Sequence, residues 1–454
     1  MKINWLYHKT IKNDKNLLMK YYKILYLVML AIFLVPLCEQ QLEVFSIKPL
    51  DGYYFKSLKP EFTSKDFINS NFQDASEQYM NEHFGFRNTL LRCRNQIFFS
   101  IFHQSPNTDN TLGSDGYLYE NKYINEYYGN NLVGDSIIDF LTQDIRALQD
   151  TLANHHIVLL TVIAPSKPYF FSQYIPSSMN LTPENQETNY AYLKKYAEER
   201  ELNLINFNDY FLKQPEALKN NPLYSINGIH WTHYAATMAF DSILKRLGQL
   251  SGKAFPEMVV TSTEKITASG GTDDDIANTM NLLRVPVNNE DLIHPHVQFE
   301  FKGARPKVLG VADSYYGTLE SLHLLADAFD SPDYWFGYEL KFPRSKYDVI
   351  EKKPDFLRNE ILSRDAIILM CTPPNAHRLS WGFVQDALAL FRPADVACKY
   401  NFAQQKDFED RKYSISHSTE WLQGLLNSAK KNHENPDAFF DKYVIGLQEE
   451  QTKK

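Results

Sequence analysis

A strand, a sharp turn and a helix are predicted by one stretch of the chain, KVLGVADSYYGTLESLHLLADAF, residues 307–329. Its first residues have the continuous hydrophobicity of a buried parallel strand. Asp313 and Ser314 follow at once, and both residue types are favoured at helix starts. In open α/β sheets, ligands bind at the carboxyl ends of the strands. Ser314 is therefore either a helix-capping residue or a nucleophile at the mouth of the sheet, close to helix amides that can stabilise an oxyanion.

The same alternation of strand and helix extends along most of the chain. Continuous apolar runs typical of buried strands and amphipathic runs typical of helices follow one another at short spacing. The predicted strands are 156–165, 202–207 and 365–373, and the predicted helices are 136–153, 189–200 and 381–391. Alternation at these lengths predicts an α/β fold with a mostly parallel sheet flanked by helices.

Composition and charge narrow the class of protein. The chain has 454 residues, of which 44% are hydrophobic and 22% charged, an ordinary balance for a globular protein. The net charge is −8 and no basic stripe is present, which argues against a nucleic-acid partner. The four cysteines form no CxxC pair, so no cysteine metal site is predicted. A disulfide between Cys371 and Cys398 is one possibility in an oxidising compartment.

The N-terminus has the pattern of a membrane segment. Six lysines crowd the first 23 residues, and the uncharged run ILYLVMLAIFLVPLC follows at 24–38. Positive charge before an apolar run favours a cytoplasmic N-terminus. We expect a cytoplasmic segment at 1–20 and a single transmembrane anchor at 21–38, facing an extracytoplasmic body. A cleaved signal peptide is the alternative, but Pro36-Leu37-Cys38 lacks the small residues of a cleavage site.

The rest of the chain divides by pattern into three parts. Residues 39–110 read as a juxtamembrane segment with helices, interrupted near Gly85. Residues 111–427 hold the α/β pattern and are the predicted catalytic domain. Residues 428–454 are polar and Lys-rich, as expected of a frayed C-terminal tail.

A histidine at a predicted helix start is the second candidate for chemistry. The segment NGIHWTHYAATMAF, residues 227–240, opens a helix predicted to reach about Leu247. His230 is either a structural residue or a general base. His233 shares a face with it, but its Thr and Tyr neighbours complete no metal set, and His294 and His296 are expected at the surface. The sequence contains no GxSxG, Walker, GxGxxG-after-strand or HExxH motif.

Six short segments, taken in order, resemble the alginate O-acetyltransferase family. They are EHFGFR (82–87), GSDGYLYE (113–120), APSKPYFF (164–171), GIHWTHYAA (228–236), DDDIANTMNL (273–282) and ADSYYGTL (312–319). Members of that family are membrane-anchored or periplasmic SGNH-hydrolase-like proteins that acetylate exopolysaccharides. Their Asp-x-His-Trp motif precedes a Gly-Asp-Ser nucleophile motif. The similarity spans roughly residues 75–395.

The resemblance implies specific roles for the two candidates. Ser314 would take the acetyl group, and His230 would activate it, since an imidazole can accept a proton at neutral pH. Backbone amides after Ser314, such as that of Tyr315, would serve the oxyanion. The acyl-enzyme would then pass acetyl to a sugar hydroxyl, with no cofactor.

The chain departs from the family motif at the triad acid. Gly228 stands where the Asp is expected, and Ala312 replaces the usual Gly before Asp313. Three explanations stay open. Asn227 or a backbone carbonyl orients the His230 ring; a carboxylate from 273–275 substitutes; or the site no longer catalyses. Loss of the acid costs about 10⁴ in rate in a serine protease.

Other residues of the resembling segments have a structural and a functional interpretation each. Asp313 is expected as a helix cap rather than as a catalytic group. Lys167, after a predicted strand, is either a substrate contact or a solvated loop lysine. Trp231 is expected to pack against the sheet rather than stack on sugar.

The prediction is therefore an O-acetyltransferase anchored in the inner membrane and facing the periplasm, acting on a cell-surface or secreted polysaccharide. The resemblance implies a multi-spanning membrane acyltransferase as the partner that supplies acetyl groups. Two alternatives remain: an esterase using the same Ser314 and His230 with water as acceptor, and a non-catalytic polysaccharide-binding or assembly subunit, suggested by Gly228.

Overall fold

The computed structural model describes residues 2–42, 44–51, 57–179, 187–219, 221–266, 270–286, 291–342 and 348–397. The chain divides into two compact units. The N-terminal unit comprises Met1–Glu120 with Ile226–Gly228 and Asp274–Asn288. The sheet unit comprises Asn121–Ser225, Ile229–Asp273 and Asn289–Lys454. Both the predicted tail at 428–454 and Cys398 of the possible disulfide lie outside the described residues.

A seven-stranded sheet forms the centre of the sheet unit, with the strand order β10-β9-β8-β7-β11-β3-β4. The strands are β3 Val158–Ile163, β4 Leu204–Asn206, β7 Val308–Ala312, β8 Asp333–Phe336, β9 Leu340–Phe342, β10 Asp348–Val349 and β11 Ala366–Cys371. Five neighbouring strands, from β8 through β4, pair in parallel, whereas β9 and β10 pair antiparallel at one edge. Every residue of β3, β7 and β11 is buried. The predicted mostly parallel α/β fold is confirmed.

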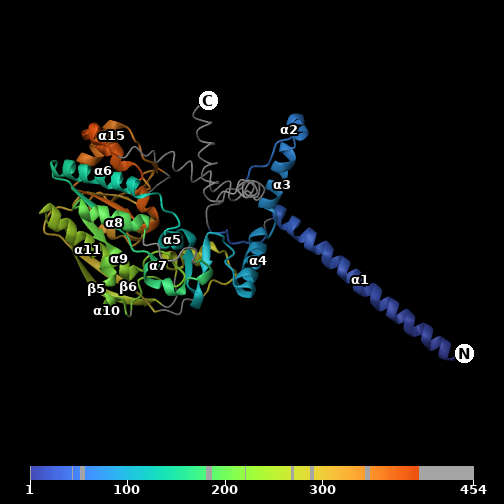
Figure 1. Ribbon diagram of the computed structural model, residues 1–454. Coiled ribbons are helices and arrows are strands. Elements are labelled where there is room, and N and C mark those ends of the chain that lie inside the picture. Colours follow the sequence, from blue (N-terminus) through green and yellow to red (C-terminus); the bar gives the residue numbers. More distant parts are fainter. Residues whose placement is uncertain are drawn as a thin grey trace. The chain divides into compact units, whose positions relative to one another are not determined.

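Successive side chains of a strand point to opposite faces of the sheet. Because the central strands are apolar on both faces, helices cover both. Leu309 and Val311 of β7 and Ile367 and Leu369 of β11 join one buried apolar cluster. The same cluster takes residues from α6 Asp135–Ala153, α8 Asn189–Glu199, α15 Pro354–Leu362 and α16 Phe383–Phe391. The intervening Gly310 faces the Tyr316 ring of α13 Ser314–Ser321, on the other side. In Figure 1, α6 and α15 lie on one side of α8, and α11 His233–Ser251 lies on the other.

Two features of the sheet unit differ from the sequence-based expectation. The helix predicted to reach residue 329 breaks at His323, which adopts a left-handed conformation, and continues as α14 Leu324–Ala328. The sequence pattern places His294 and His296 just before a strand, but both belong to that strand, β6 Leu292–Glu300, which pairs antiparallel with β5 Glu257–Ile266. Most of β5 is exposed, so its sequence has no buried face to create the alternating pattern of a predictable strand.

The N-terminal unit is mainly helical. Helix α1, Lys2–Leu42, contains an apolar segment at Met19–Leu42 with a mean hydropathy of 2.0 over its most apolar window. This segment is long and apolar enough to cross a membrane, and it is compatible with an anchor or a signal sequence. Three helices follow: α2 Ser64–Ile68, α3 Asn71–His83 and α4 Arg87–Phe102. The predicted interruption near Gly85 lies between α3 and α4, where the backbone passes so close to the Pro36 carbonyl that a Cβ would collide with it.

The remaining described elements are short. They are β1 Asn110–Leu112, β2 Leu118–Glu120, α5 Asn121–Tyr127, α7 Lys167–Phe171, α9 Phe207–Leu212, α10 Pro215–Leu218 and α12 Asp275–Thr279. Six 3-10 turns complete the described chain: η1 Ser114–Gly116, η2 Ser172–Tyr174, η3 Ser177–Met179, η4 Gly271–Asp274, η5 Pro373–Arg378 and η6 Pro393–Asp395.

Candidate active site

The Asp313–Ser314 turn lies at the carboxyl end of β7, as the strand pattern predicts. Asp313 is the N-cap of α13, and its Oδ1 accepts a hydrogen bond from the Tyr315 amide at 3.2 Å. Ser314 is the first residue of the helix and is exposed, whereas its neighbours are buried. The Tyr315 amide therefore donates to the Asp313 cap, which is a different partner from the oxyanion expected of it.

The second carboxylate oxygen of Asp313 ties β7 to the end of its neighbour β11. Oδ2 accepts from the amide of Thr372 at 2.6 Å, from the hydroxyl of Thr372 at 2.7 Å and from Nδ2 of Asn375 at 2.9 Å. Arg378 in turn donates to Oδ1 of Asn375 through Nε and a terminal nitrogen, at 3.0 and 2.9 Å. Asp313 is only 5% exposed, so these donors compensate for its desolvation. Its geometry is that of a structural carboxylate that holds the serine turn.

His230 lies beside Ser314, although 84 residues separate them in the sequence. Its Nε2 is 2.9 Å from Oγ of Ser314, a hydrogen-bonding distance. The segment that carries His230 is held by Thr232, whose amide donates to the Leu223 carbonyl at 3.0 Å. The Thr232 hydroxyl donates to the Pro222 carbonyl and accepts from the Ala235 amide to cap α11. The structure thus brings together the two residues that the sequence placed on separate loops.

Aromatic packing holds the His230 loop against the helix that begins at Ser314. The ring of Tyr315 lies 4.8 Å from that of His230, and its hydroxyl donates to the Ile229 carbonyl. Trp231 is fully buried, with its ring 5.4 Å from Tyr315 and edge-to-face with Phe207 at 5.8 Å. Trp231 therefore packs in the core and does not present a face to a sugar.

Lys167 does not occupy the exposed position expected of a substrate contact or of a solvated lysine. It is the first residue of α7 and is fully buried. Its Nζ donates to the Ser225 carbonyl at 2.9 Å. This bond joins the segment after β3 to the chain just ahead of the His230 loop. The position of Lys167 supports a structural role inside the sheet unit.

The groups considered as substitutes for the triad acid make contacts with other residues. Within the N-terminal unit, Nδ2 of Asn227 donates to Oδ1 of Asp274 at 3.1 Å and to the Pro286 carbonyl at 2.7 Å. Oδ1 of Asp275 accepts from the Ile276 amide at 2.7 Å. In the sheet unit, Asp273 lies beside His294. Which of these groups orients the His230 ring remains a prediction from the sequence.

Three side chains missed as a set by the sequence patterns gather in the sheet unit. The rings of His233 and His294 lie 3.7 Å apart, and Nε2 of His294 is 3.4 Å from Oδ2 of Asp273. Burial, with a smaller effect from His294, lowers the pKa of His233 to about 4. Burial also lowers the pKa of His294, although Glu264 opposes it. His296 is 59% exposed, as expected, whereas His294 is half-buried, with 20% of its side chain exposed.

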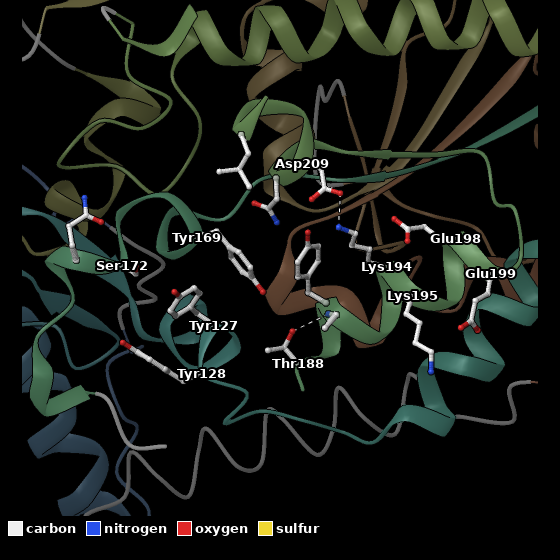
Figure 2. Close-up of a pocket in the computed structure, with 15 residues that line it drawn as sticks. Tyr127, Tyr128, Tyr169, Ser172, Thr188, Lys194, Lys195, Glu198, Glu199 and Asp209 are labelled. Atoms are coloured by element: carbon white, nitrogen blue, oxygen red, sulfur yellow. Dashed lines mark hydrogen bonds and ion pairs between the residues drawn. The ribbon is translucent and has the colours of Figure 1, made fainter. Parts of the chain in front are cut away.

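A cavity of about 1060 Å³ lies beyond the carboxyl ends of β3 and β4, on the sheet edge where Ser314 follows β7. Four tyrosines line it, together with polar and charged groups; the tyrosines are Tyr127, Tyr128, Tyr169 and Tyr190. Figure 2 shows Tyr127, Tyr128 and Tyr169 on one side and the helix that carries Lys194 and Lys195 on the other. Neither Ser314 nor His230 lines this cavity. Aromatic rings beside hydrogen-bonding groups suit a sugar, whose ring has apolar faces and a polar edge.

Comparison with known proteins identifies the class of this fold. Residues 111–297 match the family model of the SGNH hydrolase-like domain of the acetyltransferase AlgX. The expected family resemblance is confirmed. The match also confirms the expectation of an acetyltransferase-type enzyme. It includes His230 and ends before Ser314, so the pairing of these two residues is known from the geometry above.

Several solved structures are similar to the chain at low sequence identity. The O-acetyltransferase domain of Pseudomonas putida AlgJ is 14% identical, over 59% of this chain and 92% of that one, with a TM-score of 0.39. Pseudomonas aeruginosa AlgX is 14% identical over 64% and 69%, with a TM-score of 0.38. Bacillus cereus PatB1 is 12% identical over 54% and 91%, with a TM-score of 0.34. No curated protein matches the sequence.

Proposed function

We propose that this protein is a polysaccharide O-acetyltransferase that works through an acetyl-serine intermediate on Ser314. The observation that carries the proposal is the 2.9 Å separation between Nε2 of His230 and Oγ of Ser314. Ser314 is exposed at the carboxyl edge of the sheet and can reach a donor from solvent. The match of residues 111–297 to an acetyltransferase domain supports acetyl as the transferred group.

The proposed first half-reaction forms the acetyl-enzyme. His230 accepts the hydroxyl proton as Oγ of Ser314 attacks the acetyl carbonyl of an oxygen ester. The tetrahedral intermediate collapses with cleavage of the bond to the donor oxygen, which takes the proton from His230 as it leaves. The buried Asp313 acts as a positioning residue, because its hydrogen bonds to Thr372 and Asn375 fix the turn that presents Ser314.

The proposed second half-reaction passes the acetyl group to a sugar. His230 takes the proton of a sugar hydroxyl, the sugar oxygen attacks the acetyl carbonyl, and Ser314 leaves with the proton returned by His230. We place the acceptor chain in the tyrosine-lined cavity at the same sheet edge. Its polar rim, which includes the Lys194–Asp209 ion pair at 2.7 Å, can hydrogen-bond sugar hydroxyls.

The location and the donor partner belong to the same proposal. The apolar segment Met19–Leu42 supports attachment to the inner membrane with the sheet unit on the periplasmic side. Its short lysine-rich N-terminus would remain in the cytoplasm. The described residues contain one candidate span, and one helix alone cannot carry acetyl groups across a bilayer, so we propose a multi-spanning membrane acyltransferase as their source.

Esterase activity is the second candidate, because the exposure of Ser314 admits water as well as a sugar. The replacement of the motif Asp by Gly228 suggests the third candidate, a protein that binds polysaccharide without catalysis.

The test incubates the full chain in detergent with an activated acetyl ester, with and without oligosaccharides. Ser314→Ala and His230→Ala serve as the controls.

Each candidate predicts a different outcome. Acetylation of the oligosaccharide by the wild type, abolished by both substitutions, supports acetyl transfer. Free acetate at a rate that is independent of the acceptor supports the esterase. Oligosaccharide binding with no turnover in either the wild type or the variants supports the non-catalytic protein and contradicts the proposal.

A further inference from the structure

Three side chains from distant parts of the sequence converge in the sheet unit. His233 is the first residue of α11, Asp273 lies in the η4 turn and His294 lies in β6. Each offers one nitrogen or oxygen ligand atom, and these atoms all lie within 4.8 Å of one another. Asp273 is 1% exposed and His294 is 20% exposed. The group is thus partly enclosed, with an opening on the histidine side.

The three ligand atoms lie close enough together to face one small ion, and one of their separations equals the edge of a zinc tetrahedron. Zinc ligands at about 2.0–2.1 Å from the metal are about 3.4 Å apart along the edges of the tetrahedron. Nε2 of His294 and Oδ2 of Asp273 are separated by 3.4 Å. The His233 ring lies against that of His294, and its ligand nitrogen is within 4.8 Å of the ligand atoms of the other two residues.

The chemistry of the donors points to the same class of ion. Two imidazoles and one carboxylate are the ligands of open zinc sites, which use three protein groups and leave a fourth position to water. Magnesium and calcium instead prefer sets made up of oxygen atoms. Nothing in the sequence spacing reveals this set, because HxxxH and CxxC motifs are absent and its members lie in three separate segments.

We propose that His233, Asp273 and His294 form a binding site for a divalent zinc ion. The ion would join the start of α11 to η4 and to β6. His233 follows the proposed base His230 by three residues, so the site would stabilise the segment that carries the base. This is a structural and positioning role, and acetyl transfer involves no bond to the metal.

The experiment uses the full chain without a polyhistidine tag, stripped with a chelator and then titrated with ZnCl2. Bound metal is measured by mass spectrometry after desalting, and Tm is measured by differential scanning fluorimetry. We expect one zinc per chain and a rise in Tm of about 4 °C at zinc 100-fold above its Kd. Magnesium chloride at the same concentration should give neither effect.

Substitutions separate this site from adventitious binding to other histidines. His294→Gln and Asp273→Asn should each weaken zinc affinity on the order of 100-fold and remove the Tm rise. His296→Gln is the matched control, because His296 lies two residues along the same strand, is 59% exposed and pairs with Glu264. It should bind zinc like the wild type.

Two results would overturn the proposal. One is a wild-type chain that binds less than half an equivalent of zinc and shows no rise in Tm. The other is zinc binding that the three substitutions weaken equally. Circular dichroism of each metal-free variant shows whether a loss of binding is only a loss of folding. Because the readouts are metal content and Tm, they distinguish this site from the proposed acetyl transfer.

Discussion

The carboxylate of Asp313 accepts two hydrogen bonds from one residue, the amide of Thr372 at 2.6 Å and its hydroxyl at 2.7 Å. This pair joins the carboxyl ends of β7 and β11, the two strands at the centre of the sheet. The serine turn is therefore fixed by the neighbouring strand as well as by its own helix. Asp313 thus holds the turn that presents Ser314.

Replacing Asp313 with Asn should both destabilise the protein and slow acetyl transfer. An amide nitrogen in place of Oδ2 would face the Thr372 and Asn375 donors, so several hydrogen bonds would be lost in a buried site. We expect a loss of roughly 2–4 kcal/mol in the free energy of unfolding. Urea denaturation measures it. Asp327→Asn, at an exposed position, should change it by less than about 0.5 kcal/mol; equal effects of the two substitutions would contradict the buried network.

Gly310→Ala tests the close packing beneath the serine helix. A Cβ at Gly310 would lie 2.5 Å from the ring of Tyr316, which is fully buried and cannot move aside. Overpacking of this kind costs about 1–3 kcal/mol. Gly303→Ala is the matched control, because a Cβ there meets no atom within 4 Å. Thermal unfolding should show a lower Tm for the Gly310 variant alone, and an unchanged Tm would contradict the packing described here.

Glu126 should make stability depend on pH. Its side chain is fully buried and accepts from the Tyr190 amide at 2.9 Å. Burial raises its pKa from 4.5 to about 7, although the hydrogen bonds that its carboxylate accepts oppose the effect. Between these values the folded state holds a proton that the unfolded state has released, so the unfolding free energy falls as pH rises.

The size of this effect is roughly 3 kcal/mol between pH 4.5 and 7, with no further change above that range. Glu126→Gln should remove this component, so the difference in unfolding free energy between wild type and variant should vary with pH over that window. Urea titrations at half-unit steps of pH measure it. A difference that stays constant with pH would show that Glu126 ionises normally in the folded protein.

The tyrosine-lined cavity predicts a separate effect on the sugar acceptor. Tyr128→Ala should raise the KM for the oligosaccharide about 10-fold, because the ring buries apolar surface against the sugar and a loss of about 1.4 kcal/mol is tenfold in affinity. Formation of the acetyl-enzyme should not change. Tyr128→Phe retains the ring and should behave nearly as wild type. If Tyr128→Ala leaves the KM for the acceptor unchanged, the acceptor binds elsewhere.

Much of the central sheet could be predicted from the sequence because its strands are buried on both faces. The runs at 156–165 and 365–373 correspond to β3 and β11, and 307–329 contains β7 and the serine turn. The exposed strand β5 was not predicted, since an exposed strand carries no continuous or alternating apolar pattern. Short edge strands such as β9 are equally hard to predict, because three half-buried residues form no recognisable pattern.

The candidate site was predictable only in part. Ser314 could be singled out because it directly follows a buried strand, and His230 could be paired with it because the order of the two segments matched a known family. Thr372 and Asn375 were missed, although polar residues that directly follow a buried strand are a usable signal. The cluster of His233, Asp273 and His294 depends on a tertiary meeting of three segments, which no local pattern encodes.

In the proposed reaction Ser314 carries the acetyl group and His230 is its base. The most direct measurement is mass spectrometry of the full chain after brief exposure to an activated acetyl ester, followed by peptide mapping. We predict one acetyl group on the peptide that contains Ser314, absent in Ser314→Ala, formed far more slowly in His230→Ala and lost when an oligosaccharide acceptor is added. An unmodified Ser314 in the wild type, or acetylation at the same rate in His230→Ala, would contradict the account.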